Sequence, residues 1–261
     1  MTYKCPDCGL SIGMGSTSCI RCKCPIKNIV NGVKSTPKEI EERKKPKILQ
    51  KITGVSSPKY DDIGKILDGL NIKFKSFNEL QYKCDILFLN CGTQDKIDTI
   101  KLRKFVEDGG CLYASDLMDT TLNKTFPNIF DFAGHIGNKM KMNAEVVDKE
   151  LVELIKGVVP NNMVEIEFDL GSWAVLNKSQ GDVLLKSSSS KFVGKPLMVK
   201  VKYGKGMIFF TSFHNIAAIS ESQRNLLKLL ILSLYASYLG QTVNDVSLLT
   251  GNDLSRIINQ L

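Results

Sequence analysis

Two stretches decide the fold: VKYGKGMIFFTSFHN (residues 201–215) and FVEDGGCLYASD (residues 105–116). The first reads as a strand, a glycine turn and a second strand that runs into a histidine. The second reads as the end of a helix, a double-glycine stop and an apolar strand. When both strands lie in one sheet, we expect Ser115, Asp116 and His214 to meet at one rim.

Helix and strand patterns alternate before residue 116. The run CDILFLN has the continuous apolar character of a strand that is covered on both faces. We expect Ile97, Ile100, Leu102, Phe105 and Val106 on the inner face of one helix. The predicted elements are a strand at 47–55, a helix from Ser57 to about Gly69, strands at 72–77 and 84–90, a helix at 94–108 and a strand at 111–115. This order predicts an α/β fold with a mostly parallel sheet and helices on both faces.

The second half reads less regularly. We expect residues 116–143 to form a loop with short helical pieces, and residues 144–156 to become helical. Further strands are predicted at 164–168, 182–186, 195–202 and 207–212. Ser220 and Gln223 fit a capping box that opens a helix, which Gly240 ends after Leu239. The tail at 241–261 is predicted to form one or two small helices.

Cysteines crowd the N-terminus, with five of the eight in the first 24 residues. The spacing C-x2-C-x10-C-x2-C gives two knuckles, whose four thiolates suit a closed, structural Zn²⁺ site. The predicted ligands are Cys5, Cys8, Cys19 and Cys22, with Cys24 as an alternative to Cys22. A fragment this short cannot bury a core, so the metal would supply its folding free energy.

The composition of the chain excludes only a few classes of function. The 261 residues carry a net charge of +8, which favours acidic partners weakly, since a basic solvated face is common. The start of the chain lacks the apolar segment of a signal peptide. The longest apolar run, 226–239, is shorter than the roughly 20 residues that span a bilayer. We therefore expect a cytoplasmic protein.

Two resemblances follow from these segments. CPDCGLSIGMGSTSCIRCKC is similar to short N-terminal zinc ribbons, which bind proteins or nucleic acid, although Lys23 stands where a second glycine is usual. Residues 45–240 resemble the class I glutamine-amidotransferase-like superfamily in its ThuA-like branch. YKCDILFLNCG, LRKFVEDGGCLYASD and VKYGKGMIFFTSFHN carry that resemblance. It implies a flavodoxin-like sheet, a catalytic cysteine at a strand-to-helix elbow and a histidine after a late strand.

The chain departs from this pattern where the family has its catalytic groups. The elbow falls at Ser115 and Asp116, without the nucleophilic cysteine. His214 matches the motif histidine, but the position of the triad glutamate holds Ile216. The segment 90–92, Asn-Cys-Gly, lies where the resemblance implies an oxyanion-binding loop.

Residual hydrolase chemistry would need a nucleophile, a base and a group that orients the base. Ser115 is the first candidate nucleophile and Cys91 the second, because a thiol at a strand end near helix N–H groups can be acidified. His214 would be the base, and Asp116 or Asp169 would orient it.

The sequence divides into a zinc ribbon (1–27), a basic linker (28–46), the α/β domain (47–240) and a helical tail (241–261). The favoured function is a non-catalytic adaptor or ligand-sensing component of a larger complex. Its ribbon and linker would dock a protein, or a nucleic acid. The alternatives are a hydrolase of altered chemistry that uses Ser115 and His214, and a nucleic-acid-binding module.

Overall fold

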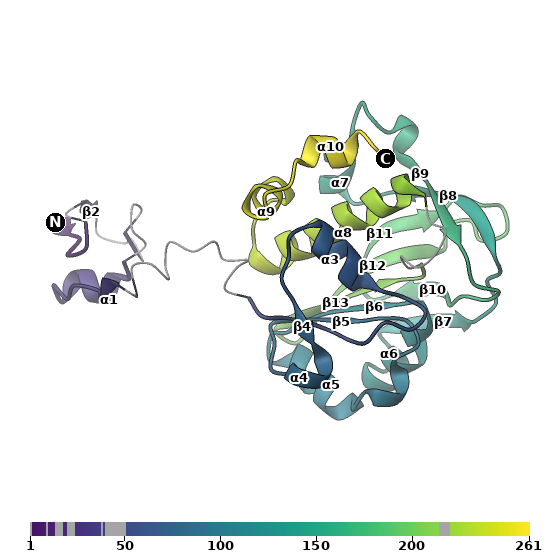
Figure 1. The fold of residues 1–261 in the computed structure, drawn as a ribbon, viewed down its shortest axis with the longest axis horizontal. Helices are drawn as coiled ribbons and strands as arrows, with labels where there is room; N and C mark the ends of the chain where they lie inside the picture. The colour runs from purple at the N-terminus through teal and green to yellow at the C-terminus, as the bar shows by residue number, and fades with distance from the viewer. Residues whose placement is uncertain are drawn as a thin grey trace. The chain divides into compact units, whose positions relative to one another are not determined.

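The structure is a computed structural model that describes residues 2–8, 10–13, 18–19, 24–37, 39, 51–213 and 220–261 (Figure 1). The chain forms two compact units, Met1–Gln50 and Lys51–Leu261. Each unit is described by itself.

A short hairpin opens the first unit. Strand β1 (Thr2–Lys4) pairs antiparallel with β2 (Ser11–Gly13), and helix α1 (Ile26–Val30) follows after Pro25. The backbone N–H of Ser35 donates to the Asp7 carboxylate at 2.7 Å. The apolar cluster of this unit consists mainly of cysteine side chains, so the described part has little hydrocarbon core.

A nine-stranded sheet organises the second unit. Its order is β4-β3-β5-β6-β13-β12-β11-β8-β9, and the first five strands run parallel to one another. Numbered along the chain, those five have the order 2-1-3-4-5 of flavodoxin-like folds. The other four extend the sheet through antiparallel pairs. The strands are β3 (Thr53–Val55), β4 (Lys75–Ser76), β5 (Ile86–Leu89), β6 (Cys111–Ser115), β8 (Met140–Val146), β9 (Met163–Phe168), β11 (Asp182–Ser187), β12 (Pro196–Tyr203) and β13 (Gly206–Thr211).

Helices cover both faces of the parallel strands (Figure 1). Helices α4, α5 and α6 lie on one side, and α3 and α8 on the other. The helices are α3 (Ile63–Gly69), α4 (Phe77–Leu80), α5 (Thr99–Glu107), α6 (Asp119–Thr125), α7 (Lys149–Ile155), α8 (Glu221–Leu239), α9 (Val243–Leu249) and α10 (Leu254–Ile258), with short 3-10 turns η2 (Gln94–Lys96), η3 (Asp116–Met118) and η4 (Pro160–Asn162). The alternation of side chains along each strand supplies both faces with apolar groups.

Helix α8 is the main apolar element of its face. Ser220 caps it by accepting from the Gln223 N–H at 3.1 Å, and Gly240 ends it at φ +62°. The Tyr235 hydroxyl lies 2.7 Å from the Thr53 hydroxyl, which ties the helix to β3. The predicted start and end of this helix are confirmed, and so are the two small helices of the tail.

Three predictions about the first half need correction. The helix predicted from Ser57 begins at Ile63, because residues 56–62 form a loop at the sheet rim. The strand predicted at 72–77 is the two-residue β4, since Phe77 already opens α4. Ile100, predicted to face inward, is 81% exposed.

The prediction of a loop at 116–143 is wrong in part. Strand β7 (Phe130–Gly134) pairs with β10 (Val175–Ser179) in a separate two-stranded sheet, and β8 begins at Met140. Met142, Ala144 and Val146 are buried while their neighbours are not, which is the period of a strand. The helix expected later in 144–156 is α7.

Among the described residues, no single helix meets the length and hydropathy of a membrane span. Helices α8 and α9 meet it only as a pair, bent by 103°.

Gly206 should be essential for joining β13 to the sheet. A Cβ atom there would lie 2.2 Å from the Gly110 carbonyl oxygen and 2.4 Å from that of Val106. We expect Gly206→Ala to lower the free energy of unfolding by about 3 kcal/mol. Gly171→Ala is the matched control, because a Cβ atom there has no neighbour within 4 Å. Urea unfolding followed by circular dichroism would measure both, and equal midpoints would contradict the prediction.

Candidate functional site

The first candidate site lies at the carboxyl ends of β3, β5 and β6. Open α/β sheets bind ligands where the strand order reverses, which here is between β3 and β5. The loop at residues 56–62 leaves β3 at this point, and the loop at 90–93 leaves β5. The end of β6 brings Ser115 beside them.

Hydrogen bonds join the two loops through Ser56, Asn90 and Thr93. The Asn90 N–H donates to the Ser56 hydroxyl at 2.8 Å, and its side-chain amide donates to the Ser56 carbonyl at 2.7 Å. The Thr93 hydroxyl donates to the Asn90 carbonyl at 2.7 Å. All three residues are buried. The bonds hold the loops against each other with the chain's own polar groups.

Ser115 connects the network to β6. Its hydroxyl donates to the Asp61 carboxylate at 2.6 Å and accepts from the Cys91 N–H at 3.1 Å. Ser115 and Asp61 have no exposed surface. The candidate nucleophile is therefore bonded on two sides within the protein.

Asp116 adopts a left-handed backbone, with φ +43°. Its carboxylate accepts from the Ala174 N–H at 2.7 Å and from the Cys91 thiol at 3.8 Å. Ala174 follows Trp173, which is buried and stacks on Phe168 with ring centroids 4.0 Å apart. Asp116 thus anchors the segment before β10.

The second candidate nucleophile has an unfavourable environment. Burial raises the pKa of the Cys91 thiol well above its usual range, and the nearby Asp116 carboxylate raises it further. The thiolate is the nucleophilic form of cysteine, so the arrangement suppresses the reactivity of this thiol. A backbone hydrogen bond from Leu117 lowers the pKa of Cys91, as expected of nearby N–H groups, but burial outweighs it.

The remaining predicted site residues are placed as follows. His214 lies outside the described residues, which stop at Phe213 after β13. Asp169 borders the same small hollow as Asp116, together with Trp173 and Ser212. Asp169 and Asp116 therefore remain alternatives for a group that orients His214.

Sequence reasoning missed two acidic partners at this rim. Asp61 belongs to the interval that was read as a helix, and only the fold brings it to Ser115, 54 residues away. Asp119 is buried and lies 2.9 Å from the His135 imidazole Nε2, whose side chain is 39% exposed. Neither aspartate belongs to a local motif, so the sequence carried no signal for either.

The second candidate site is the cysteine cluster of the first unit. The sulfur atoms of Cys5, Cys8 and Cys19 all lie within 4.8 Å of one another, and those of Cys8 and Cys19 are 3.5 Å apart. Thiolates around a tetrahedral zinc ion, with Zn–S bonds near 2.3 Å, stand about 3.8 Å apart. The three described thiols therefore fit a metal ion.

The same backbone contacts occur twice in this unit, 14 residues apart, and they help to identify the fourth metal ligand. The Cys5 N–H donates to the Leu10 carbonyl, and the Cys19 N–H donates to the Cys24 carbonyl, both at 2.9 Å. The antiparallel pairs that flank these bonds, Lys4 with Ser11 and Ser18 with Pro25, also match.

In this repeat Cys24 corresponds to Leu10, which packs against the buried cluster of Cys5, Cys19, Cys24 and Ile29. The repeat therefore assigns Cys24 to a core position, and the described group of three thiols does not include it. Cys22, the predicted ligand that corresponds to Cys8, lies outside the described residues.

No family model and no curated protein sequence matches the chain. Similar solved structures include glutamine amidotransferase-like proteins. A glutamine amidotransferase from Thermotoga maritima is 11% identical, with a TM-score of 0.44, over 79% of this chain and 95% of its own. A GMP-synthase-subunit-A-like protein from Thermoplasma acidophilum is 13% identical, with a TM-score of 0.48, over 75% and 94%.

Large glycosidases are also similar. A β-galactosidase from Bacillus circulans sp. alkalophilus is 14% identical, with a TM-score of 0.44, over 73% of this chain. The match covers only 31% of that enzyme. All three of these structures have TM-scores below 0.5 against this chain.

The metal site makes a specific prediction about two cysteines. We expect the purified chain to contain about one equivalent of zinc, and Cys8→Ser to lose it, because a ligand is removed. Cys24→Ser should keep the zinc, since Cys24 takes a core position. Elemental analysis by mass spectrometry would measure both variants. Loss of zinc from Cys24→Ser with retention in Cys22→Ser would reverse the assignment.

Proposed function

We propose that the chain is a non-catalytic, amidotransferase-like adaptor or ligand-sensing component of a larger complex. Its sheet supplies a rigid body, and its cysteine-rich N-terminal unit, held by zinc, docks a partner. Two observations support the α/β part of this proposal: the 2-1-3-4-5 strand order and the sequence resemblance of residues 45–240. The proposal places this role in the cytoplasm.

One observation carries the non-catalytic part: both candidate nucleophiles are buried and bonded at the rim. The Ser115 hydroxyl is shared between Asp61 and the Cys91 N–H, and no part of Ser115 is exposed. The Cys91 thiol is buried against Asp116. A nucleophile must reach its substrate within about 3 Å, so these groups would need the loops to open before they could react.

A docking role suits the first unit for a separate reason. A four-thiolate zinc site is closed, so its metal would stabilise the fold and leave no position for a substrate. We favour a protein as the partner. A nucleic acid remains the alternative, with binding that would weaken steeply as salt increases, because each phosphate contact releases counterions.

One observation favours a second candidate, a hydrolase of altered chemistry that uses Ser115 and His214. The 2.6 Å bond from Ser115 to Asp61 shows that the hydroxyl already donates to a carboxylate, which could accept its proton in place of His214. This candidate requires substrate access to a side chain that has no exposed surface.

The non-catalytic proposal predicts that both candidate nucleophiles are unreactive in the folded protein, and the hydrolase predicts a reactive Ser115. In the folded protein at pH 8, we expect iodoacetamide to modify Cys91 at least about 100-fold more slowly than an exposed thiol, because burial disfavours the thiolate. A fluorophosphonate probe should leave Ser115 unlabelled. Ser190→Cys, at an exposed position, supplies the reference thiol, and the same reaction in urea shows that Cys91 is reactive when unfolded. Peptide mass spectrometry would locate each modification.

Detection of enzymatic turnover would contradict the non-catalytic proposal most directly. Steady hydrolysis of glutamine or of an ester, abolished by His214→Ala in a variant that keeps its thermal stability, would refute the non-catalytic proposal. It would establish the hydrolase in its place.

A further inference from the structure

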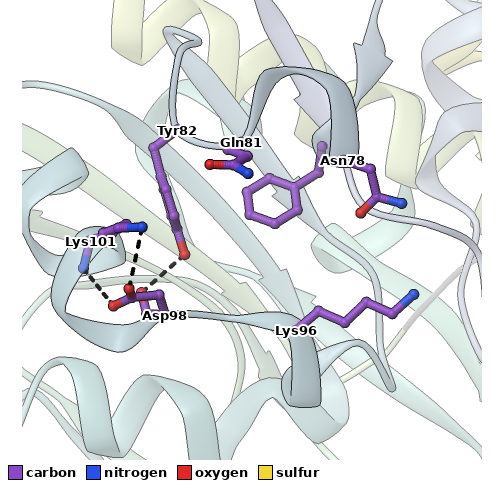
Figure 2. A pocket seen from close by; sticks show the side chains of 7 residues that line it. Asn78, Gln81, Tyr82, Lys96, Asp98 and Lys101 are labelled. Carbon is purple, nitrogen blue, oxygen red and sulfur yellow. Dashed lines mark hydrogen bonds and ion pairs between the residues drawn. The ribbon is translucent and has the colours of Figure 1, made fainter.

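A separate cavity of about 220 Å³ lies beside α4 and the start of α5. Figure 2 shows Asn78, Gln81 and Tyr82 on one side of it, and Lys96, Asp98 and Lys101 on the other. Phe77 completes the lining. The cavity shares no residue with the rim network. This volume is many times the roughly 10–15 Å³ that a single water molecule requires, so a small organic molecule would fit.

Among the described lining residues, Asp98 is the only acidic one, and its carboxylate already accepts hydrogen bonds from the protein backbone. The Asp98 carboxylate caps α5 by accepting from the Ile100 and Lys101 N–H groups at 3.0 and 3.1 Å. The backbone hydrogen bond from Lys101 lowers the pKa of Asp98, so the carboxylate stays ionised. Its other oxygen lies 3.7 Å from the Lys101 ammonium, which is 63% exposed.

The two lysines set the charge of the remaining lining. None of the described acidic residues forms an ion pair with Lys96, which is exposed and lies on the 3-10 turn η2. The Asn78 and Gln81 side-chain amides at the same cavity can each donate through N–H and accept through their carbonyl oxygen. Two lysines against one committed carboxylate give the lining a net positive charge. An anion is the ligand that this set of groups favours.

Aromatic rings form the wall of the cavity. Phe77 and Tyr82 meet edge to face with centroids 5.3 Å apart, and the Tyr82 hydroxyl donates to the Asp98 carbonyl at 3.0 Å. Burial raises the pKa of Tyr82 to about 12, so this hydroxyl stays protonated at neutral pH. The rings supply an apolar surface next to the lysines, which suits a ligand with both a charged and an apolar part.

Gln81 holds an unusual backbone conformation at the cavity, with φ +51° and ψ −118°. This region is rare for residues other than glycine, and such strain costs about 1–3 kcal/mol and clusters at ligand sites. The Gln81 N–H bond to the Phe77 carbonyl fixes the turn. The cavity lining therefore includes one residue with a strained backbone.

We propose that this cavity binds a small phosphate monoester with a compact apolar group, with Lys96 contacting the phosphate and the Phe77 and Tyr82 rings contacting the apolar group. The proposal does not rest on the proposed function, because none of these residues lies at the rim or in the cysteine unit. It adds a ligand class that a sensing component could detect.

The experiment titrates the full-length, zinc-loaded chain with phenyl phosphate, inorganic phosphate and neutral phenol, using calorimetry. We expect phenyl phosphate to bind more tightly than inorganic phosphate, and phenol to show no saturable binding. Lys96→Gln should weaken phenyl phosphate binding about tenfold, because a charged contact is lost. Lys205→Gln is the matched control, since it removes one exposed charge from the β12–β13 turn and should leave the affinity unchanged.

Three outcomes would overturn the proposal. The first is the absence of saturable binding by either phosphate compound. The second is equal weakening by Lys96→Gln and Lys205→Gln, which would show a general effect of the +8 net charge. The third is unchanged affinity in Lys96→Gln while backbone amide shifts on titration move at Ser56 and Asn90, which would place the ligand at the rim. Thermal unfolding of each variant checks that the cavity is still folded.

Discussion

The hydrogen bond from the Ser115 hydroxyl to the Asp61 carboxylate holds together the carboxyl ends of β3, β5 and β6. Asp61 belongs to the loop after β3, Ser115 ends β6, and the Cys91 N–H from the loop after β5 donates to the same hydroxyl. A carboxylate that loses its hydration must be compensated by such bonds, or its burial destabilises the fold. The geometry of the rim therefore depends on this one side chain.

The parallel half of the sheet could be predicted because its strands are nearly continuous apolar runs. The runs around Ile86–Leu89 and Cys111–Ser115 are buried on both faces, so their composition alone identifies them. Strand β4 has two exposed residues, and β7 and β10 pair through register shifts. Such strands are stabilised by tertiary contacts more than by their own pattern. This explains why β7 and β10 were not predicted, and why β4 is shorter than the strand predicted at 72–77.

Local sequence patterns also predicted some residues of the candidate sites, while others depend on tertiary contacts. The cysteine spacing is a local signal, and the three described thiols do lie together. At the rim, Ser115 and Asp116 could be found because they follow a predicted strand. Asp61 could not be found, because its role depends on a contact between segments 54 residues apart. The spacing already favoured Cys22 and left Cys24 as an alternative, and the backbone hydrogen bonds that relate Leu10 to Cys24 argue against that alternative.

The rim and the cavity differ in whether their polar side chains already form hydrogen bonds within the protein. This difference decides which of the two can bind a ligand through those side chains. At the rim, Ser115, Asn90 and Thr93 direct their hydrogen bonds to other groups of the chain and are buried. At the cavity, the Lys96 and Gln81 side chains are exposed to solvent. The Asp98 carboxylate there caps helix α5. A ligand gains affinity only from groups whose hydration it replaces with better bonds. The hydrogen bonds of Ser115, Asn90 and Thr93 therefore stabilise the rim, whereas the groups at the cavity remain open to solvent.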